Sequence, residues 1–300
     1  MTSLQGSTLS VIGAGVMAEA IIAGVLERKL LAPSSVVASH PRADRRHALG
    51  EKYGIHVTAD NADAARRGDV VVLGIKPQVM PSVLTELHGS LGPNKLVISI
   101  IAGATTQTLR KGLDHGALVR VMPNTPAQIG EGVNIWYATP ETTPAHREQA
   151  QALLGALGHE LQVADERFVA MATAVSGTGP TYVFLVMEAL IDSAVHLGFP
   201  RHLAHDLVLE TIKGSVAFAE RTQKHPAQLR DMVTSPGGTS AAALHELERG
   251  RLRTVLADAV WAAYRRTMSL SDSLSAGKDP EPMPPRSRAI SALRCASACA

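Results

Sequence analysis

The chain has 300 residues, which is enough for one large domain or two ordinary ones, and its net charge is +2. Apolar residues make up 45% and aromatic residues only 3%, so the cores must be built mainly from Ala, Val, Leu and Ile. A net charge this close to zero does not indicate a nucleic acid or a membrane surface as an electrostatic partner. We therefore expect neither.

Both cysteines, Cys295 and Cys299, lie at the end of the chain. Two cysteines at that position cannot form a disulfide framework for a fold of this size. The lack of such a framework fits a protein of a reducing compartment. His202 and His205 lie one helical turn apart, but no third ligand follows at a recognisable spacing, so we predict no metal site. The N-terminus lacks the basic start of a secretory signal, and no apolar run approaches the length of a membrane span. A cytoplasmic protein is the expectation.

The first element is a short buried strand at residues 8–13, followed by a glycine-rich turn and a helix over 20–28. The turn reads GAGVMA and has the G-x-G-x-x-G/A form of a dinucleotide-binding fingerprint in its strand–turn–helix context. Gly13 permits the tight turn, Gly15 lets the backbone approach a pyrophosphate, and Ala18 lets the helix sit against the strand. The pattern predicts cofactor contacts from Ile12, Gly13, Ala14, Gly15, Val16 and Met17.

A second strand is predicted at 35–39, and its end carries Ser39, His40 and Arg42. A site that prefers NAD places Asp or Glu there, about 20 residues beyond the glycines, against the ribose 2′-hydroxyl. Donors and a cation in place of a carboxylate favour a 2′-phosphate, and therefore NADPH with NADH possible. The alternative is that Arg42 is a solvated residue in the first turn of the helix that ends near Lys52.

Strands and helices continue to alternate up to about residue 164. We predict strands at 56–58, 70–75, 95–101, 117–122, 132–138 and 159–163, and helices at 61–67, 79–88, 106–112 and 144–157. Ligands of open parallel sheets bind outside the carboxyl ends of the strands. The cofactor side is therefore assigned Asn61, Ile75, Lys76, Pro77, Ala102, Gly103 and Asn124, although Lys76 could also be an ordinary surface lysine. This half is predicted to be an α/β Rossmann domain, residues 1–164.

Residues 165–272 show helical patterns only, at 167–175, 181–197, 202–219, 226–232, 241–249 and 252–270. Several of these helices are apolar almost all round, notably over 255–263, and such a helix is usually buried on several sides. A second copy of the chain would bury it, so we predict an all-α domain that forms a homodimer. Residues 273–300 are rich in Ser, Pro, Ala and Arg and are predicted to be a disordered tail.

A turn at 234–240 precedes the helix that starts near residue 241. Pro236, Gly237 and Gly238 bar a helix before residue 238, and Thr239 and Ser240 are good helix-capping types. Free N–H groups and the positive end of a helix dipole make this a place to hold a small carboxylate. The alternative is a capped helix with nothing bound.

Six motifs occur in order: GAGVMA at 13–18, IKP at 75–77, VMPNTP at 121–126, SGTGP at 176–180, HPAQL at 225–229 and SPGGTS at 235–240. Together they resemble the pyrroline-5-carboxylate reductase family, over about residues 8–270. The resemblance implies NAD(P)H-dependent reduction of 1-pyrroline-5-carboxylate, an imino acid, to proline, the last step of proline synthesis. It also implies a Rossmann domain, a helical domain that interlocks two subunits, and in some members rings of dimers.

The resemblance also implies a substrate site. The substrate carboxylate would be bound by N–H groups of Gly237, Gly238, Thr239 and Ser240, and the Ser240 hydroxyl would hydrogen-bond the imine nitrogen as the catalytic group. Ser176 and Glu166 are assigned to the substrate as well, with a helix-start acid as the alternative for Glu166.

Two positions depart from the family pattern. The family usually has threonine where Ser240 stands, and serine keeps the hydroxyl but loses the methyl group that limits its rotamers. It often has serine at the position of His40. A chain that ends at Leu270 is expected to keep activity and to dimerise.

Two other functions stay open. A related imine or β-hydroxyacid reductase could share this two-domain architecture. The hydroxyacid enzymes are expected to have a lysine early in the helix after the glycine pair, and residues 178–197 contain none. A non-catalytic dinucleotide-binding regulator would not need the SGTGP and SPGGTS stretches.

Overall fold

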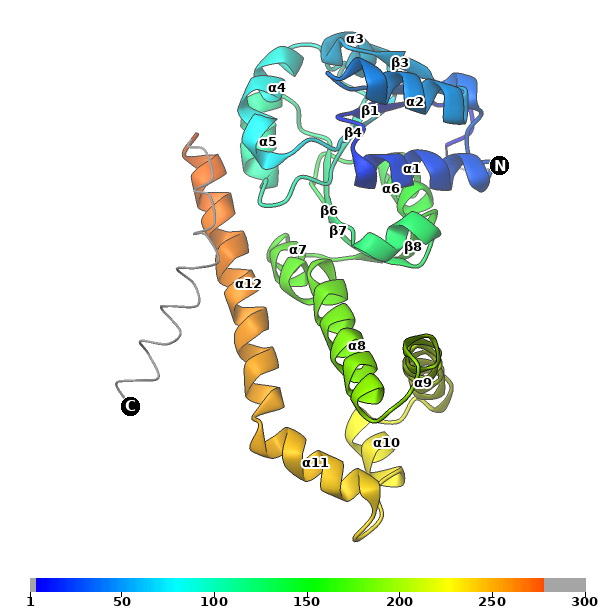
Figure 1. Cartoon of the computed structure of the whole chain (residues 1–300). Coiled ribbons are helices and arrows are strands. Elements are labelled where there is room, and N and C mark those ends of the chain that lie inside the picture. Colours follow the sequence, from blue (N-terminus) through cyan, green and yellow to red (C-terminus); the bar gives the residue numbers. More distant parts are fainter. Residues whose placement is uncertain (1–3, 278–300) are drawn as a thin grey trace.

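The protein is described by a computed structural model that covers residues 4–277, in two regions (Figure 1). The N-terminal region is one eight-stranded sheet in the order β3-β2-β1-β4-β5-β6-β7-β8. The strands are β1 (Leu9–Ile12), β2 (Val36–Ser39), β3 (His56–Thr58), β4 (Val70–Leu73), β5 (Leu96–Ser99), β6 (Leu118–Met122), β7 (Gly132–Ala138) and β8 (Gly158–Gln162). Paired strands are parallel except β6 and β7.

Helices cover both faces of the sheet, which explains why β1, β2, β4 and β5 are buried along their whole length. They are α1 (Val16–Glu27), α2 (Ala43–Tyr53), α3 (Asn61–Arg67), α4 (Met80–Leu87), α5 (Thr106–Leu113) and α6 (Pro144–Gly155), with short 3₁₀ turns at Pro33–Ser35, Pro77–Val79 and Thr125–Ile129. One apolar cluster unites the sheet with α1 and α6, and a second unites it with α3, α4 and α5. The strand order switches direction at β1, where β2 lies on one side and β4 on the other, and ligands of such sheets bind there.

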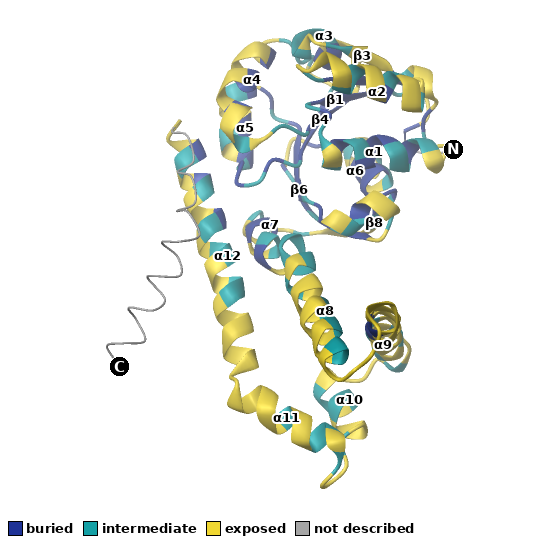
Figure 2. Cartoon of the chain, in the orientation of Figure 1, coloured by how far each residue is buried: buried dark blue, intermediate teal, exposed yellow. Residues whose placement is uncertain are grey.

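The remaining elements are helical: α7 (Arg167–Ala172), a π-turn (Thr173–Gly177), α8 (Gly179–His196), α9 (Arg201–Thr222), α10 (Pro226–Met232), α11 (Thr239–Arg249) and α12 (Leu252–Ser275). They extend away from the sheet, with α8 and α9 as a helical hairpin and α12 beside α7 (Figure 1). No residue of α8, α10 or α11 is buried. Figure 2 shows the contrast: the sheet is dark blue inside, whereas the helical region is mostly yellow.

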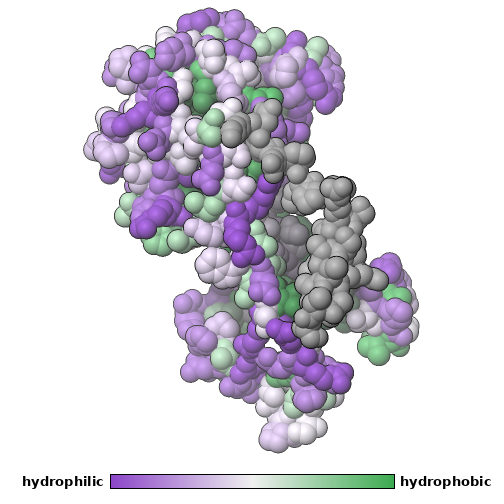
Figure 3. All heavy atoms as spheres, turned by 90° about the vertical axis from the view of Figure 1, so that its left-hand side faces the viewer, coloured by the Kyte–Doolittle hydropathy of each residue, from purple (hydrophilic) through white to green (hydrophobic). Residues whose placement is uncertain are grey.

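The predicted fold class, a Rossmann domain followed by an all-α domain, is confirmed. The sheet ends at Gln162 and α7 begins at Arg167, on either side of the expected boundary at residue 164. From the side of α12, a broad N-terminal region narrows into the helical one, where apolar residues lie among polar ones (Figure 3).

Two expectations about the second half were wrong. Residues 273–275 are not part of a tail, because α12 continues to Ser275, and the rest of the predicted tail, 278–300, lies outside the described residues. One helical stretch, Arg167–His196, is long and apolar enough to cross a membrane by length and composition alone, which the sequence analysis did not anticipate. One such stretch is weak evidence for a membrane span.

Candidate functional site

The glycine turn between β1 and α1 has the shape that a pyrophosphate needs. Gly13 has a φ of +80°, and a methyl group added to it would lie 2.3 Å from Cγ2 of Ile75, so only glycine fits. Gly15 is the N-cap of α1, no side chain caps the helix, and an added methyl would meet nothing closer than 4.0 Å. The first N–H groups of α1 therefore face open space beside exposed Val16. Ile12, Ala14 and Met17 lie in the same strand–turn–helix unit.

Ala18 has the packing role that the fingerprint assigns to it. It is buried, and a methyl group added to Gly74, after β4, would lie 2.7 Å from its Cβ. Two small residues thus let α1 sit close to the sheet.

Arg45 of α2 holds this turn in place, a role that no sequence pattern indicates. Its Nε donates to the Ala14 carbonyl (3.1 Å) and its Nη2 to Glu19 of α1 (2.5 Å). Glu19 also accepts from Lys52 (2.8 Å) and Tyr53 (2.9 Å). Burial opposes the charged carboxylate, but these hydrogen bonds outweigh burial and lower the pKa of Glu19 to about 2. Glu19 therefore stays ionised and ties α1 to α2.

At the end of β2 the structure brings two predicted cofactor residues together. The Ser39 hydroxyl donates to Oδ1 of Asn61 (2.7 Å), and Nδ2 of Asn61 donates to Glu86 (2.7 Å). His40 lies beside them, and burial, followed by the charges of Arg45 and Arg42, lowers its pKa. A neutral imidazole can exchange hydrogen bonds with a phosphate but adds no charge.

Arg42 is less available than the sequence suggested. Its guanidinium forms an exposed ion pair with Asp44, a carboxylate that the sequence analysis did not weigh. It can meet a 2′-phosphate only by sharing or leaving that pair, and exposed pairs of this kind are weak.

Ile75, Lys76 and Pro77 follow β4 directly, and Ile75 contacts Gly13. The Lys76 side chain is exposed and has no acidic partner among residues 4–277, so it presents a cation at the carboxyl end of the sheet. Ala102 and Gly103 follow β5, but Gly103 is covered: an added methyl group would lie 3.0 Å from Cβ of Leu270 in α12. The position of Gly103 therefore serves helix packing, and its contact with the cofactor stays a prediction.

Asn124 was predicted to bind the cofactor, and the structure uses both ends of its side-chain amide within the protein instead. Its Oδ1 accepts from the Val133 N–H (2.9 Å), and its Nδ2 donates to the Ser176 carbonyl (3.2 Å). The side chain therefore links the motif after β6 to the SGTGP motif.

Glu166 was assigned to the substrate, but its carboxylate is bound inside the molecule. It accepts from Arg120 (2.8 Å), from the Thr106 N–H (2.8 Å) and from the Thr106 hydroxyl (2.6 Å). The Arg120 side chain is 5% exposed and that of Glu166 23%. Glu166 is the N-cap residue of α7, but its side chain makes no capping hydrogen bond there. Its carboxylate instead places a negative charge at the N-terminus of α5, where the helix dipole favours one. It joins the two regions of the chain.

Ser176 lies in the π-turn, and its hydroxyl donates to the Ala172 carbonyl (3.1 Å). Turns of this kind recur at functional sites. The hydroxyl and the carbonyl of Ser176 are therefore both hydrogen-bonded within the protein, the hydroxyl to Ala172 and the carbonyl to Asn124.

The turn before α11 differs from the expected cap. Gly238, not Thr239 or Ser240, is the N-cap, and no side chain caps the helix. Gly237 has a φ of +71° with open space around it. The helix therefore starts at Thr239 and leaves its first N–H groups free, as anion binding requires. The turn lies at the end of the molecule away from the sheet (Figure 1), so the two predicted half-sites do not meet within one chain.

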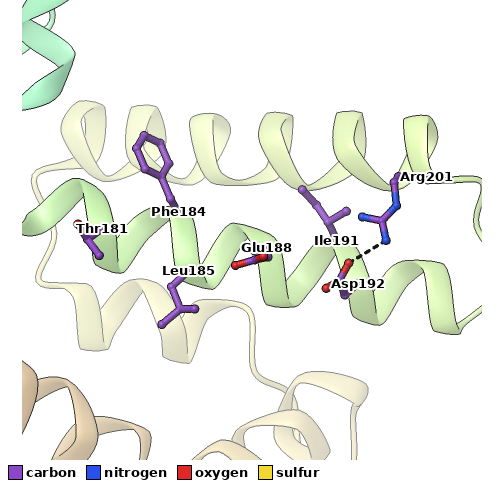
Figure 4. Close-up of a pocket in the computed structure, with 7 residues that line it drawn as sticks. All are labelled: Thr181, Phe184, Leu185, Glu188, Ile191, Asp192 and Arg201. Carbon is purple, nitrogen blue, oxygen red and sulfur yellow. Dashed lines mark hydrogen bonds and ion pairs between the residues drawn. The ribbon is translucent and has the colours of Figure 1, made fainter. Parts of the chain in front are cut away.

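A cavity of about 610 Å³ lies along α8 and the start of α9. Figure 4 shows Phe184 and Leu185 on different sides of α8 and the ion pair between Asp192 and Arg201 (3.0 Å) at one end. This cavity lies on the exposed apolar part of the helical region, away from the glycine turn.

Residues 166–270 match the model of pyrroline-5-carboxylate reductase dimerisation, and residues 8–103 match that of NADP oxidoreductase, coenzyme F420-dependent. The pyrroline-5-carboxylate reductase of Synechocystis is 42% identical over 263 residues, which cover 87% of this chain and 97% of the relative. The chain belongs to the pyrroline-5-carboxylate reductase family. The enzyme of Arabidopsis thaliana is 40% identical over 263 residues, 87% of this chain and 95% of that one.

A solved pyrroline carboxylate reductase shares the whole architecture. The crystal structure from Plasmodium falciparum, with NADP bound, has a TM-score of 0.82 and 30% identity and covers 89% of this chain and 99% of that one. This relative thus combines a similar sheet with a similar helical region.

Proposed function

We propose that this protein reduces 1-pyrroline-5-carboxylate to L-proline with NADPH, with NADH as a possible substitute, as the last step of proline synthesis. The observation that carries the proposal is the match to reductases of that name over nearly their whole length. The glycine turn lies within residues 8–103 and the SPGGTS turn within residues 166–270, the two stretches that match the family models. This favours the reductase over a related imine reductase or a non-catalytic regulator.

The residues around the glycine turn fit a dinucleotide. The free N–H groups at the start of α1 would bind the pyrophosphate, and Gly15 leaves the room for it. Ser39, His40 and Asn61 would bind the 2′-phosphate, with Arg42 and Lys76 adding positive charge. The reduced nicotinamide supplies the hydride when it is bound.

The turn before α11 would bind the substrate. N–H groups of Gly237, Thr239 and Ser240 would hold its carboxylate at the helix start, whereas the Gly238 N–H donates to the Ser235 carbonyl (3.0 Å). The Ser240 hydroxyl, which has no hydrogen-bond partner among the described residues, would hydrogen-bond the imine nitrogen. That nitrogen gains the electron pair of the C=N bond and takes up a proton as hydride reaches the ring carbon, so a donor there stabilises the transition state.

The complete site would need a second copy of the chain, because the SPGGTS turn lies away from the sheet that holds the cofactor. The apolar surface of α8 and α12 supports a homodimer: Phe184 is 57%, Leu185 64% and Trp261 59% exposed in the single chain. A ring of dimers and a cytoplasmic location stay predictions.

The test is an assay of the purified protein. We expect the absorbance of NADPH to fall only when pyrroline-5-carboxylate is added; no loss of NADPH or NADH would contradict the proposed function. Ser240→Ala is expected to lower kcat/KM by about a hundredfold, as the removal of one transition-state donor does, with NADPH affinity unchanged.

Thr239→Ala is the matched control for that variant. Thr239 is exposed and is assigned to the substrate through its N–H, which alanine keeps, so we expect activity close to that of the unaltered protein. Loss of NADPH binding in Ser240→Ala would show that the role of Ser240 is wrong.

A further inference from the structure

Strand β6 and the residues after it hold both ends of the segment 166–177, which leads from the sheet to α8. At one end Arg120 binds the Glu166 carboxylate (2.8 Å). At the other end Nδ2 of Asn124 donates to the Ser176 carbonyl (3.2 Å). The segment is thus fixed at two points, one in β6 and one just after it.

Asn124 is suited to this because an amide is both donor and acceptor. It is 8% exposed, and its Oδ1 accepts from the Val133 N–H (2.9 Å) at the start of β7 while its Nδ2 faces Ser176. A carboxylate of the same shape could keep the bond to Val133 but could not donate to Ser176.

The bond reaches a part of the chain that is not a regular helix. In the π-turn the Tyr182 hydroxyl donates to the Ala174 carbonyl (3.0 Å) and the Thr178 hydroxyl to the Thr173 carbonyl (2.8 Å). Hydroxyl groups here replace some of the helical hydrogen bonds that a π-turn disturbs.

Packing restricts the same turn from the side of β6. A methyl group added to Gly177 would lie 3.0 Å from Cε of Met122, so the turn lies directly on the strand end. Because α8 begins at Gly179, the position of this turn sets the direction of α8.

We propose that Asn124 is a positioning residue that fixes the start of α8 against the end of β6 and thereby sets how the helical region is placed relative to the bound nucleotide. It acts through Ser176 and contacts neither substrate nor cofactor. The consequence for catalysis rests on the proposed function, in which hydride must pass between groups held by the two regions. A misplacement of about 1 Å costs on the order of a hundredfold in rate.

Asn124→Asp in the full-length protein tests this proposal. We expect kcat to fall by about tenfold to a hundredfold, with the Kd for NADPH unchanged. The loss should shrink as the pH falls, because a protonated carboxyl group can again donate to the Ser176 carbonyl. Asn124→Ala removes both bonds without burying a charge, so its loss of kcat should not depend on pH in this way.

Asn134→Asp is the matched control. Asn134 is fully buried in β7, and its Nδ2 donates to the Leu154 and His159 carbonyls (3.2 and 3.4 Å), all within the N-terminal region. We expect lower thermal stability but an unchanged kcat per folded molecule.

Hydrogen exchange supplies a measurement that needs no turnover, so it separates failure of this proposal from failure of the proposed function. Amides of residues 166–182 should exchange faster in Asn124→Asp and Asn124→Ala than in Asn134→Asp. A raised Kd for NADPH with unchanged exchange would make Asn124 a nucleotide ligand and overturn the proposal. Unchanged kcat and unchanged exchange would also overturn it.

Discussion

Two glycines of one turn serve different purposes at the scale of single residues. Gly13 is required by the backbone, since its φ of +80° and the contact with Ile75 leave no room for a side chain. Gly15 has an ordinary φ of −76°, and nothing in the chain lies where a methyl group would go. That space is where the fingerprint places a pyrophosphate.

Replacing each glycine by alanine should separate the two roles. Gly13→Ala is expected to lower the free energy of unfolding by about 1–3 kcal/mol, because of its strained backbone and its clash with Ile75. Gly15→Ala should leave stability nearly unchanged but weaken NADPH binding. Thermal unfolding and NADPH titration check this pair, and a Gly15→Ala protein that binds NADPH normally would contradict it.

At the scale of elements, the C-terminal end of α12 belongs to the core of the other region. Leu274 is 4% exposed and joins the apolar cluster formed by the sheet with α4 and α5. Nearby, the hydroxyl groups of Ser275 and Thr108 are hydrogen-bonded (3.1 Å), and Leu270 lies on Gly103. The expectation that the chain could end at Leu270 is therefore not supported by the structure.

Leu274→Ala is expected to lower the free energy of unfolding by about 2–5 kcal/mol, because it opens a cavity in that cluster. Leu161→Ala in β8 is the control, since Leu161 is exposed and should cost much less. In the same way, ending the chain after Leu270 should lower the melting temperature, whereas ending it after Gly277 should not. Equal stability of the two shortened proteins would show that the end of α12 is dispensable.

At the scale of the whole molecule, the single chain leaves its helical region poorly covered. The Rossmann region buries its apolar residues in two clusters, whereas α8, α10 and α11 bury none of theirs (Figure 2). Large exposed apolar surfaces mark sites of association. The same surface lies in the part of the chain that matches the dimerisation model.

Leu185→Asp should therefore give a monomer that still binds NADPH but no longer reduces the imine, because each site would lack residues of the second copy. Val57→Asp is the control: Val57 is also exposed, but it lies on β3 at the edge of the sheet. Light scattering and the NADPH assay check both variants. A Leu185→Asp protein that is monomeric and fully active would exclude a site shared between copies.

The sequence by itself determined the order of the elements and the shape of the glycine turn. Apolar runs predicted β1, β2, β4 and β5, because a strand covered on both faces is apolar along its whole length, and the predicted bounds of the half-buried β7, Gly132–Ala138, match the structure. Gly13, Gly15 and Ala18 were assigned roles that the geometry fits, because the fingerprint is local and depends only on backbone shape.

Only the tertiary structure decided what the polar side chains around the cleft do. Asn124 and Glu166 were both assigned to the site from the sequence. Their partners, Ser176 and Arg120, lie 52 and 46 positions away along the chain, and no local sequence pattern reveals such pairs. The structure likewise separated the SPGGTS turn from the glycine turn. A buried polar group must find a partner wherever the fold places one, so its role is settled by packing rather than by its neighbours along the chain.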